Sequence, residues 1–428
     1  MEIVVEGINR LEGQISVPGD KSISHRAIIL GAIAQGETKV HNFLMAQDCQ
    51  STLECMLALG AKIEIINHSL VKIKGVGLNG PKKPRSALDV GNSGTTIRLL
   101  TGLLSGQNFN TTITGDDSIR KRPMKRIIQP LSLMGAKISG ENNNRFAPLS
   151  IEGRNLNFIE YTLPVASAQV KSALLIAGLY AKEGIIVIEP QICRDHTERM
   201  LEFMQADIKV FTHKIRVTGR KQLKGVELFI PGDISSAAYF LAAASARKGF
   251  NLLIKDVGVN HTRIGIIEVL KKMGANINIL NYRMMSNEPR ADIRIEGADL
   301  AGIKINRDMI GLLIDELPLI AVLATQARGK TIISDAQELR IKETDRIKAT
   351  VKELKKMGAL IKEKEDGFEV VGPSKLRGAI CHSYYDHRMA MSLAIAALYA
   401  SGKTIIKDAE CINISYPEFF NTLIKLIK

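Results

Sequence analysis

Apolar residues recur along the chain in blocks of one kind: a helix apolar on nearly all sides, a tight turn and a β-rich run. The first block reads SHRAIILGAIAQGETKV and the last reads DHRMAMSLAIAALYASGKTIIK. The turn glycines of the six blocks are Gly36, Gly106, Gly184, Gly249, Gly329 and Gly402. A helix without a polar face is expected to be buried. The repeat is about 70 residues long, and six copies account for nearly the whole chain.

A second helix midway in each repeat is apolar on one side only, which predicts a place on a surface. It closes on Leu-Gly-Ala or Met-Gly-Ala, as at residues 59–61 and 357–359, with a degenerate third copy, Met204-Gln205-Ala206. Strand runs such as VKIKG and IRIEG end in glycine turns typical of β-hairpins. Because the repeat is too large and strand-rich for a solenoid, two globular halves of three repeats each are the simpler packing.

Two near-identical turns mark the boundary between the halves. Val17-Pro18-Gly19-Asp20 and Ile230-Pro231-Gly232-Asp233 lie about half a chain apart. The first turn is close to the N-terminus, so residues 1–19 are predicted to join residues 232–428 in one domain, and residues 20–231 to form the other. We interpret the two crossings as a double hinge, although two coincidental turns would give the same pattern.

The composition narrows the classes of function. Of the 428 residues, 45% are hydrophobic and 24% charged, the balance of a folded globular protein. The formal net charge of +14 suits an anionic partner, whether nucleic acid, a membrane surface or a small acidic substrate. Aromatic residues make up 5% and tryptophan is absent, which is thin for stacking on single-stranded nucleic acid. No apolar run approaches the roughly 18 residues of a membrane span.

Cysteines and histidines predict neither disulfides nor a metal. Five cysteines form no CxxC pair, and the acidic start of the chain lacks a signal-peptide pattern. We therefore expect reduced thiols in a cytoplasmic protein. Eight histidines include no HExxH motif and no ligand-like cluster, so no metal site is expected.

The first turns of the apolar helices are unusually polar. Ser, Asp and Asn are expected there as N-caps whatever the function. Lys21, Arg26, Arg98 and Arg388 are not, because the helix dipole disfavours a cation in the first turn by about 0.3–1 kcal/mol. A bound anion would explain them, since backbone N–H groups and the cation would share one ligand. For any single residue, a solvated side chain pointing outward is the alternative.

Two further segments fit an anion site. Residues 120–126, RKRPMKR, hold five cations in seven positions, although a nucleic-acid patch or a solvated face would look the same. Residues 338–346, ELRIKETDR, precede a surface helix. If that segment is helical, Lys342 and Arg346 share one face with Glu343 beside them. Thr344 or Asp345 could equally be a routine helix cap.

Nine motifs in chain order resemble one family. They are PGDKSISHR, GNSGTTIR, KRPM, ASAQVKSA, RDHTE, PGDISSAA, IDELP, RIKETDRI and DHRMAM, between residues 18 and 391. The sequence is similar to the 3-phosphoshikimate 1-carboxyvinyltransferases, or EPSP synthases, and resembles their bacterial class II branch. The resemblance implies an α/β fold: a two-domain inside-out α/β barrel with six βαβαββ repeats, three per domain. It implies enolpyruvyl transfer from phosphoenolpyruvate to the 5-hydroxyl of shikimate 3-phosphate, releasing phosphate, on the shikimate pathway to chorismate and the aromatic amino acids.

The resemblance also implies which residues bind the two anionic substrates, and it implies no cofactor. For shikimate 3-phosphate they are Lys21, Ser22, Arg26, Ser167, Ala168, Gln169, Arg194, Asp315 and Lys342. For phosphoenolpyruvate they are Lys21, Gly94, Arg122, Gln169, Arg346 and Arg388. A guanidinium can pair bidentately with carboxylate or phosphate, which is why arginine predominates in the second set. Residues 20–231 would bind mostly shikimate 3-phosphate, and the other domain would carry the acid/base carboxylates.

The catalytic residues implied by the resemblance are Asp315, Glu343, Lys21, Lys342 and His387. Asp315 resembles the base that accepts the 5-hydroxyl proton, and Glu343 the group that serves C3 of phosphoenolpyruvate. Lys342 would lie near the 5-oxygen and His387 on the phosphate side. Which group holds each proton at each step stays open, because nearby cations oppose the raised pKa that a carboxylic acid would need.

Two positions qualify the resemblance. Ile414 stands where some members carry a lysine assigned to phosphoenolpyruvate, so the phosphate pocket is expected to be weaker or rebuilt. Gly94 lacks a side chain where the bacterial branch sometimes has alanine. Since glyphosate occupies the phosphoenolpyruvate site in this family, the sequence predicts inhibition, and Gly94→Ala should weaken it.

Two alternatives belong to other classes of function. One is a UDP-N-acetylglucosamine enolpyruvyl transferase, which usually has a loop cysteine where Arg122 stands. The other is a basic nucleic-acid-binding protein, which would bind DNA with a steep salt dependence. The favoured interpretation is an enzyme acting on small anions, without nucleic-acid or membrane partners, and a monomer by family habit.

Overall fold

The computed structural model describes residues 1–427, and these divide into two compact units. The N-terminal unit comprises Gly19–Ile230 together with Met284–Glu288. The C-terminal unit comprises Met1–Pro18, Pro231–Arg283 and the chain from Pro289 onward. The chain passes between the units at Pro18–Gly19 and Ile230–Pro231, within the two Pro-Gly-Asp turns.

The segment Met284–Glu288 is the tip of a long hairpin whose strands belong to the C-terminal unit, and the sequence prediction had not separated it from residues 232–428. Hydrogen bonds explain why it groups with the N-terminal unit: Phe229 N donates to Ser286 Oγ at 2.9 Å, and His196 Nδ1 lies 2.8 Å from Glu288 Oε1. Both members of the second pair are buried.

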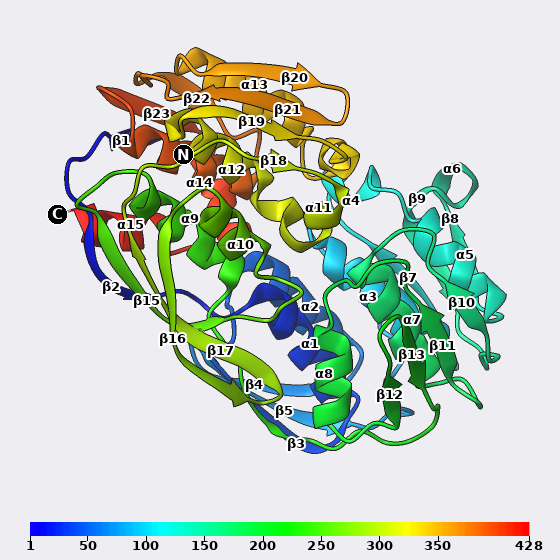
Figure 1. Cartoon of the computed structure of the whole chain (residues 1–428). Coiled ribbons are helices and arrows are strands. Elements are labelled where there is room, and N and C mark those ends of the chain that lie inside the picture. Colours follow the sequence, from blue (N-terminus) through cyan, green and yellow to red (C-terminus); the bar gives the residue numbers. More distant parts are fainter. Residues whose placement is uncertain (428) are drawn as a thin grey trace. The chain divides into compact units, whose positions relative to one another are not determined.

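Three four-stranded sheets form the strand layer of the N-terminal unit, as far as the described residues show (Figure 1). Their orders are β14-β3-β5-β4, β6-β7-β9-β8 and β10-β11-β13-β12. In each, one parallel pair is followed by two antiparallel pairs, so the same unit is built three times. The strands are β3 (Gln35–His41), β4 (Lys62–Asn67), β5 (Leu70–Val76), β6 (Leu88–Asp89), β7 (Asn110–Thr114), β8 (Lys137–Gly140), β9 (Phe146–Glu152), β10 (Glu160–Thr162), β11 (Ile185–Ile188), β12 (Ile208–Val210), β13 (Lys214–Val217) and β14 (Glu227–Phe229).

The apolar helices of this unit form its core. They are α1 (Lys21–Ala32), α3 (Gly94–Ser105) and α7 (Ala168–Gly178). Helices α3 and α7 pack so closely that a Cβ on Gly102 would lie 2.2 Å from the carbonyl oxygen of Ala173. The remaining helices are α2 (Gln47–Ala58), α4 (Asp117–Arg120), α5 (Lys125–Leu133), α6 (Glu141–Asn144) and α8 (His196–Phe203).

Over the described residues, the C-terminal unit contains two four-stranded sheets and one three-stranded sheet, and two of its strands come from the start of the chain. Its sheets run β1-β23-β22, β16-β17-β15-β2 and β18-β19-β21-β20. Strands β1 and β2 pair with β23 and β15, which explains why the residues before Gly19 belong to this unit. The strands are β1 (Ile3–Glu6), β2 (Glu12–Ser16), β15 (Asn251–Gly258), β16 (Asn276–Met285), β17 (Glu288–Glu296), β18 (Lys304–Ile305), β19 (Gly329–Ile333), β20 (Leu360–Lys364), β21 (Gly367–Gly372), β22 (Ile380–His382) and β23 (Lys403–Lys407).

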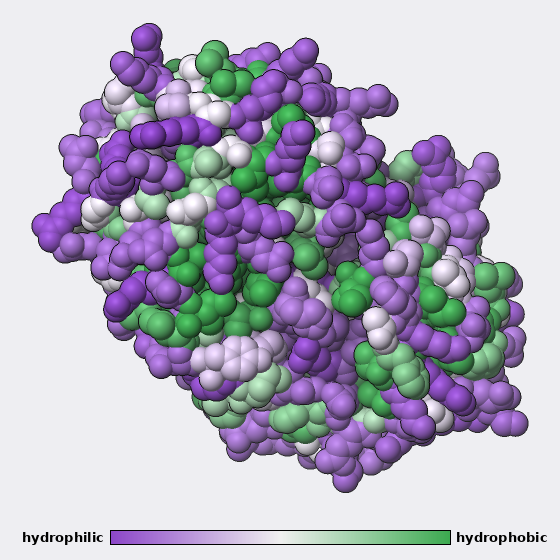
Figure 2. Space-filling view, in the orientation of Figure 1, coloured by the Kyte–Doolittle hydropathy of each residue, from purple (hydrophilic) through white to green (hydrophobic). Residues whose placement is uncertain are grey.

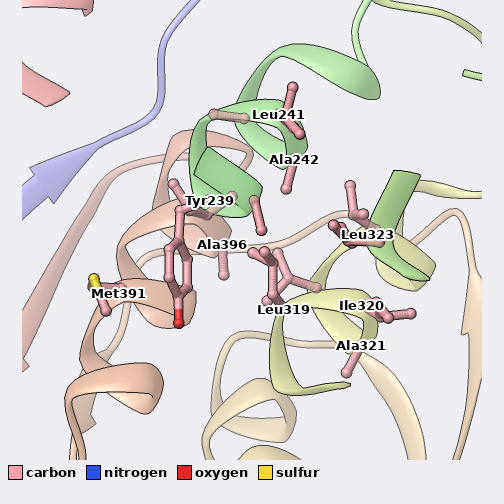
Figure 3. Close-up of a cluster of buried hydrophobic side chains, with 14 of the residues drawn as sticks. Tyr239, Leu241, Ala242, Leu319, Ile320, Ala321, Leu323, Met391 and Ala396 are labelled. Carbon is pink, nitrogen blue, oxygen red and sulfur yellow. The ribbon is translucent and has the colours of Figure 1, made fainter. Parts of the chain in front are cut away.

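Three apolar helices again meet in the core: α9 (Ile234–Ser245), α12 (Leu317–Gln326) and α14 (His387–Leu398). Every residue of α9 and of α14 is buried. Figure 3 shows side chains of the three helices, including Leu241, Leu323 and Ala396, gathered in one cluster. The other helices are α10 (Gly265–Lys272), α11 (Arg307–Leu313), η1 (Ile314–Glu316), η2 (Gln337–Ile341), α13 (Arg346–Lys356), η3 (Ala409–Ile414) and α15 (Phe419–Ile427).

The predicted α/β architecture of six repeats, three per unit, is confirmed over residues 1–427. Helices that lack a polar face lie inside each unit, and the sheets around them expose many residues, as the burial pattern of β4 illustrates. Hydrophilic residues cover much of the face shown in Figure 2, with hydrophobic ones scattered between them. Within the described chain, no helix combines the length and apolar character needed to cross a membrane.

Candidate active site

The candidate residues divide between the two units. Those in the N-terminal unit are Lys21, Ser22, Arg26, Gly94, Arg122, Ser167, Ala168, Gln169 and Arg194. Those in the C-terminal unit are Asp315, Lys342, Glu343, Arg346, His387 and Arg388. Each group is held together by hydrogen bonds or ion pairs within its own unit, so each is described separately.

In the N-terminal unit, the first turn of α1 is fixed by its own side chains. Asp20 caps the helix by accepting a hydrogen bond from Ile23 N at 2.9 Å, and Lys21 Nζ lies 2.9 Å from Asp48 Oδ2. Arg26 is 3% exposed, and its guanidinium donates to Ser22 O at 2.8 Å. The outward, solvated alternative for Arg26 is therefore wrong.

Two more contacts of Arg26 tie α1 to the third repeat. Its Nη2 donates to Ser172 Oγ on α7 at 2.7 Å, and its Nε donates to Thr197 Oγ1 on α8 at 2.6 Å. Arg26 therefore fixes α1 against α7, which begins with Ala168 and Gln169, and against α8, which follows Arg194. These two acceptors are hydroxyl oxygens, so both contacts orient the guanidinium through neutral groups.

Gly94 lies directly against two guanidinium groups. Arg98 Nη1 donates to Gly94 O at 2.9 Å, and Arg122 Nη2 donates to Asn92 Oδ1 at 2.9 Å. A Cβ on Gly94 would lie 2.7 Å from Arg98 Nη1 and 3.0 Å from Arg122 Nη1. An alanine here would require the end of the Arg98 side chain to shift, and the N–H of Gly94 lies at the start of α3, where an anion is favoured.

The basic segment at residues 120–126 is not one uniform surface. Arg122 is 9% exposed, whereas Arg120, Lys121 and Lys125 are exposed. Arg122 Nη2 also donates to Ser118 Oγ at 3.1 Å. The structure therefore separates one buried, oriented guanidinium from solvated neighbours, which the sequence pattern could not do.

The start of α7 supplies smaller polar groups. Ser167 precedes the helix and Ala168 is its first residue, both partly exposed. Gln169 Nε2 donates to Thr95 Oγ1 at 3.2 Å, which joins the starts of α7 and α3. Arg194 is partly buried in the segment before α8.

A buried ionic cluster supports that segment and was missed from the sequence. Lys171 Nζ lies 2.8 Å from Glu189 Oε2, 2.6 Å from Glu198 Oε1 and 3.1 Å from Cys193 O. Burial raises the pKa of Glu198, and the adjacent Lys171 opposes that rise. Because Glu189 and Glu198 flank Arg194, the cluster anchors its loop to α7. The RDHTE motif contains Glu198 but gave no sign of its buried partner.

A second network missed from the sequence joins the first two repeats. His25 Nδ1 lies 2.7 Å from Thr52 Oγ1, which lies 2.6 Å from Thr96 Oγ1. Thr96 in turn donates to Ser93 Oγ, the N-cap of α3, at 2.6 Å. Burial lowers the pKa of His25, and the charges of Lys21 and Arg26 lower it further, so the imidazole is neutral at neutral pH.

In the C-terminal unit, Arg346 lies among three carboxylates. Its Nε is 2.7 Å from Asp386 Oδ2, its Nη2 is 2.7 Å from Glu343 Oε2, and its Nη1 is 3.5 Å from Asp315 Oδ1. The side chain of Arg346 is 1% exposed, whereas Asp315 and Glu343 keep 16% and 17% of theirs accessible. One buried cation therefore orients two partly accessible carboxylates.

Arg388 continues this chain of charges at longer distances. Its Nη2 lies 3.8 Å from Asp315 Oδ2 and its Nη1 3.5 Å from Glu316 Oε1. Glu316 is 4% exposed and accepts a hydrogen bond from Ser235 Oγ at 2.5 Å. Asp386 caps α14 by accepting from Arg388 N at 2.9 Å, so the same carboxylate orients Arg346 and the helix that carries Arg388.

Lys342 and Arg346 do not share a helix face. The segment forms the short helix η2, which ends at Ile341, and α13 begins at Arg346 with Asp345 as its N-cap. The alternative of Asp345 as a routine cap is therefore correct: its side chain accepts from Lys348 N at 3.0 Å. Lys342 still lies near the site, since Asp315 and Glu343 are among the charges that act on it.

Burial lowers the pKa of the Lys342 ammonium, and Asp315 and Glu338 oppose that effect. About a quarter of this side chain remains accessible, so the group can meet a ligand. His387 is 1% exposed in the first turn of α14. Ile414, by contrast, is buried in the apolar core, so this position contributes no charge.

Residues 1–427 contain no group of three or more His, Cys, Asp or Glu side chains that could hold a metal ion. The five cysteines are free and buried. The candidate residues of the two units supply guanidinium, ammonium, carboxylate and hydroxyl groups.

A family model described as EPSP synthase (3-phosphoshikimate 1-carboxyvinyltransferase) matches residues 5–423. The chain belongs to the EPSP synthase family. It is 50% identical to the 3-phosphoshikimate 1-carboxyvinyltransferase of Desulforamulus reducens, with 100% of both chains covered. It is 52% identical to that of Petrotoga mobilis, with 98% of each covered. Membership of this family decides against the two alternative functions suggested by the sequence.

The fold agrees with that of solved EPSP synthases. The structure of EPSP synthase from Acinetobacter baumannii matches with a TM-score of 0.89 and 43% identity, covering 99% of this chain and 98% of the other. The enolpyruvyl transferase NikO from Streptomyces tendae matches with a TM-score of 0.81 at 18% identity, which bears on the fold alone.

Proposed function

We propose that this chain transfers the enolpyruvyl group of phosphoenolpyruvate to the 5-hydroxyl of shikimate 3-phosphate, yielding 5-enolpyruvylshikimate 3-phosphate and phosphate. The observation that carries the proposal is the placement of Asp315 and Glu343 on one buried guanidinium, that of Arg346. The reaction needs two proton-transfer groups in fixed relation, and the contacts of Asp315 and Glu343 with Arg346 support their assignment to these roles.

The N-terminal unit would bind most of the shikimate 3-phosphate. Its set is Lys21, Ser22, Arg26, Ser167, Ala168, Gln169 and Arg194. Arg26 holds Ser22 by its carbonyl oxygen, so it acts partly by orienting the turn that meets the ligand. The positive charge of this set and the N–H groups at the start of α7, which has no side-chain cap, favour a phosphate.

Phosphoenolpyruvate would be bound by residues of both sequence halves. The set is Lys21, Gly94, Arg122, Gln169, Arg346 and Arg388. Arg122 already has a defined orientation through Asn92 and Ser118, which reduces the entropy lost on binding an anion. Arg388 lies at 3.5–3.8 Å from its carboxylate partners, longer than a strong charged hydrogen bond, so it can turn to a ligand.

The chemistry then follows from the C-terminal unit. Asp315 takes the proton of the 5-hydroxyl as its oxygen attacks C2 of phosphoenolpyruvate, while C3 gains a proton from Glu343. The product of this addition is a tetrahedral ketal phosphate. Return of the C3 proton to Glu343 then restores the double bond as the C–O bond to phosphate breaks. Lys342, whose pKa is lowered by burial, would stabilise charge at the 5-oxygen, and His387 would act near the departing phosphate.

The assay combines the purified chain with both substrates and follows phosphate release, with the enolpyruvyl product identified by mass. Glu343→Gln should lose at least 100-fold in kcat, because it keeps the shape of the side chain but cannot take up a proton at neutral pH. Glu353→Gln is the matched control: Glu353 is fully buried in the same unit but contacts Lys356 and Tyr384. Release of phosphate with UDP-N-acetylglucosamine but not with shikimate 3-phosphate would contradict the proposal.

We also propose that the protein acts as a monomer in the cytoplasm. The free, buried cysteines support a reducing compartment. Light scattering at assay concentrations that gave twice the mass of one chain would contradict the monomer.

A further inference from the structure

Two buried tyrosines of the C-terminal unit differ in how their hydroxyls are satisfied. Tyr399, at the end of α14, donates to Ala242 O at 2.6 Å. Tyr239, on α9, is 1% exposed, and within residues 1–427 its hydroxyl has no hydrogen-bond partner. A buried hydroxyl without a partner destabilises a fold by about 1–3 kcal/mol. A tyrosine at this position therefore calls for an explanation that packing alone does not give.

The ring of Tyr239 is held in place by apolar neighbours. It packs edge-on against Phe419, with ring centroids 5.7 Å apart. Figure 3 shows the ring extending from α9 beside Met391 of α14. A phenylalanine would make the same apolar contacts, so the hydroxyl is the feature to be explained.

Ser235, whose Oγ donates to Glu316, precedes Tyr239 by one turn of α9, so the two side chains lie on the same face of that helix. The charges that act on the Tyr239 hydroxyl are those of Arg388, Glu316, Arg346 and Asp386. Burial raises the pKa of Tyr239 well above its ordinary value, so the phenol stays neutral and keeps its O–H as a donor. Among these groups, Glu316 and Asp386 are the acceptors.

The two acceptors differ in how firmly they are already held. Asp386 is engaged at 2.7 Å by Arg346 Nε and at 2.9 Å by Arg388 N. Glu316 has one short partner, Ser235 at 2.5 Å, and one long partner, Arg388 at 3.5 Å. If Arg388 turns to a substrate anion, Glu316 loses its cation. A buried carboxylate left without its partner is strongly destabilising.

We propose that Tyr239 is a positioning residue, whose hydroxyl donates a hydrogen bond to Glu316 when Arg388 leaves Glu316 for the anionic substrate. When the Tyr239 hydroxyl replaces Arg388 as the donor to Glu316, less free energy is needed to release Arg388. Tyr239 thereby strengthens substrate binding although it does not contact the substrate. The inference rests on the proposed role of Arg388 in binding phosphoenolpyruvate. It predicts that the hydroxyl weakens the free protein and strengthens the complex.

The test is Tyr239→Phe in the full chain, with Tyr399→Phe as the matched control. Tyr239→Phe should raise the KM for phosphoenolpyruvate about 10-fold, leave kcat and the KM for shikimate 3-phosphate within twofold, and not lower the Tm of the free protein. Tyr399→Phe should lower the Tm, because the hydrogen bonds from its hydroxyl to Ala242 O and Ala243 O are lost, and leave both KM values unchanged. A Tyr239→Phe protein with an unchanged phosphoenolpyruvate KM, or with a lowered Tm, overturns the inference.

A double-mutant cycle identifies the acceptor. In a Glu316→Gln background, the hydroxyl has no buried charge to satisfy, so Tyr239→Phe should change the phosphoenolpyruvate KM by less than twofold. A persistent 10-fold effect would rule out Glu316. If the wild-type chain released no phosphate from its proposed substrates, the proposed function would fail. The exchange itself would still be tested by the Tm shift that phosphoenolpyruvate produces in wild type and in Tyr239→Phe.

Discussion

Two candidate arginines in each unit make contacts of different kinds. In the N-terminal unit, Arg26 and Arg122 donate to carbonyl, amide and hydroxyl oxygens of Ser22, Asn92 and Ser118. In the C-terminal unit, Arg346 and Arg388 lie against carboxylates. Neutral acceptors orient a guanidinium by hydrogen bonding alone, whereas a carboxylate also offsets its charge and is oriented in return. The first arrangement suits capture of an anion, and the second suits proton transfer.

The largest effect is expected for a substitution of Asp315, which tests the proposed proton transfer in the C-terminal unit. Asp315→Asn keeps the size of the side chain but removes its ability to accept the hydroxyl proton. We expect kcat to fall about 10³–10⁴-fold, the upper range for general acid–base catalysis. Phosphate release measures the change, and an unchanged Tm shows that the fold is intact. A kcat within 10-fold of wild type would remove Asp315 from the proposed chemistry.

The next largest effect is the difference in unfolding free energy between substitutions of Arg346 and of Arg122. Arg346→Met leaves carboxylates of Asp386 and Glu343 facing a buried apolar group, so we expect a loss of about 3–5 kcal/mol in the free energy of unfolding. Arg122→Met breaks the hydrogen bonds to Asn92 and Ser118 and should lose about 1–2 kcal/mol. Urea unfolding followed by circular dichroism compares them. Equal losses would contradict the distinction between the two units.

A glycine substitution tests how closely the backbone meets the cations. A Cβ on Gly94 forces Arg98 or Arg122 to move, since it would lie within 3.0 Å of both. Overpacking of this kind is worth about 1–3 kcal/mol, so Gly94→Ala should raise the glyphosate inhibition constant and the phosphoenolpyruvate KM at least 5-fold. Gly311→Ala is the control, because a Cβ there meets nothing within 4 Å. Equal inhibition constants for wild type and Gly94→Ala would refute the assignment of Gly94 to the phosphoenolpyruvate site.

The smallest effect concerns pH and the N-terminal unit. Burial in the folded state lowers the pKa of His25, whereas the pKa in the unfolded chain is about 6.5. When the pH falls below about 6.5, His25 therefore becomes protonated in the unfolded chain while it stays neutral in the folded one. Stability from this group is complete above that pH and is lost as the pH falls, by up to about 1.4 kcal/mol per pH unit. His25→Gln should flatten this dependence in urea unfolding between pH 5 and 7. Parallel curves for the two proteins would show that His25 is not responsible.

Local patterns predicted the repeats because each is specified within about 70 residues. The second turn of the repeat shows why: Gly60, Gly135, Gly274 and Gly358 all have positive φ, which glycine adopts readily. In the degenerate third copy, Gln205 adopts φ +64 at the same position, so the turn survives without its glycine. The fold is therefore more regular than the sequence that encodes it.

The residues that the sequence could not predict are those whose partners are distant along the chain. Ser235 and Glu316 are 81 positions apart, and His25 and Thr52 are 27 apart. Nothing in their local pattern distinguishes them from ordinary helix caps and core residues. The resemblance to a family named the residues expected to touch the substrates, but not those that hold them in position, such as Lys171 and Tyr239.

The measurement that most directly tests the division of roles is calorimetric titration of shikimate 3-phosphate into two variants. Arg194→Met, in the N-terminal unit, should weaken binding about 100-fold, while Glu343→Gln, in the C-terminal unit, should bind with wild-type affinity. The opposite ranking, or equal losses in both variants, would contradict the account.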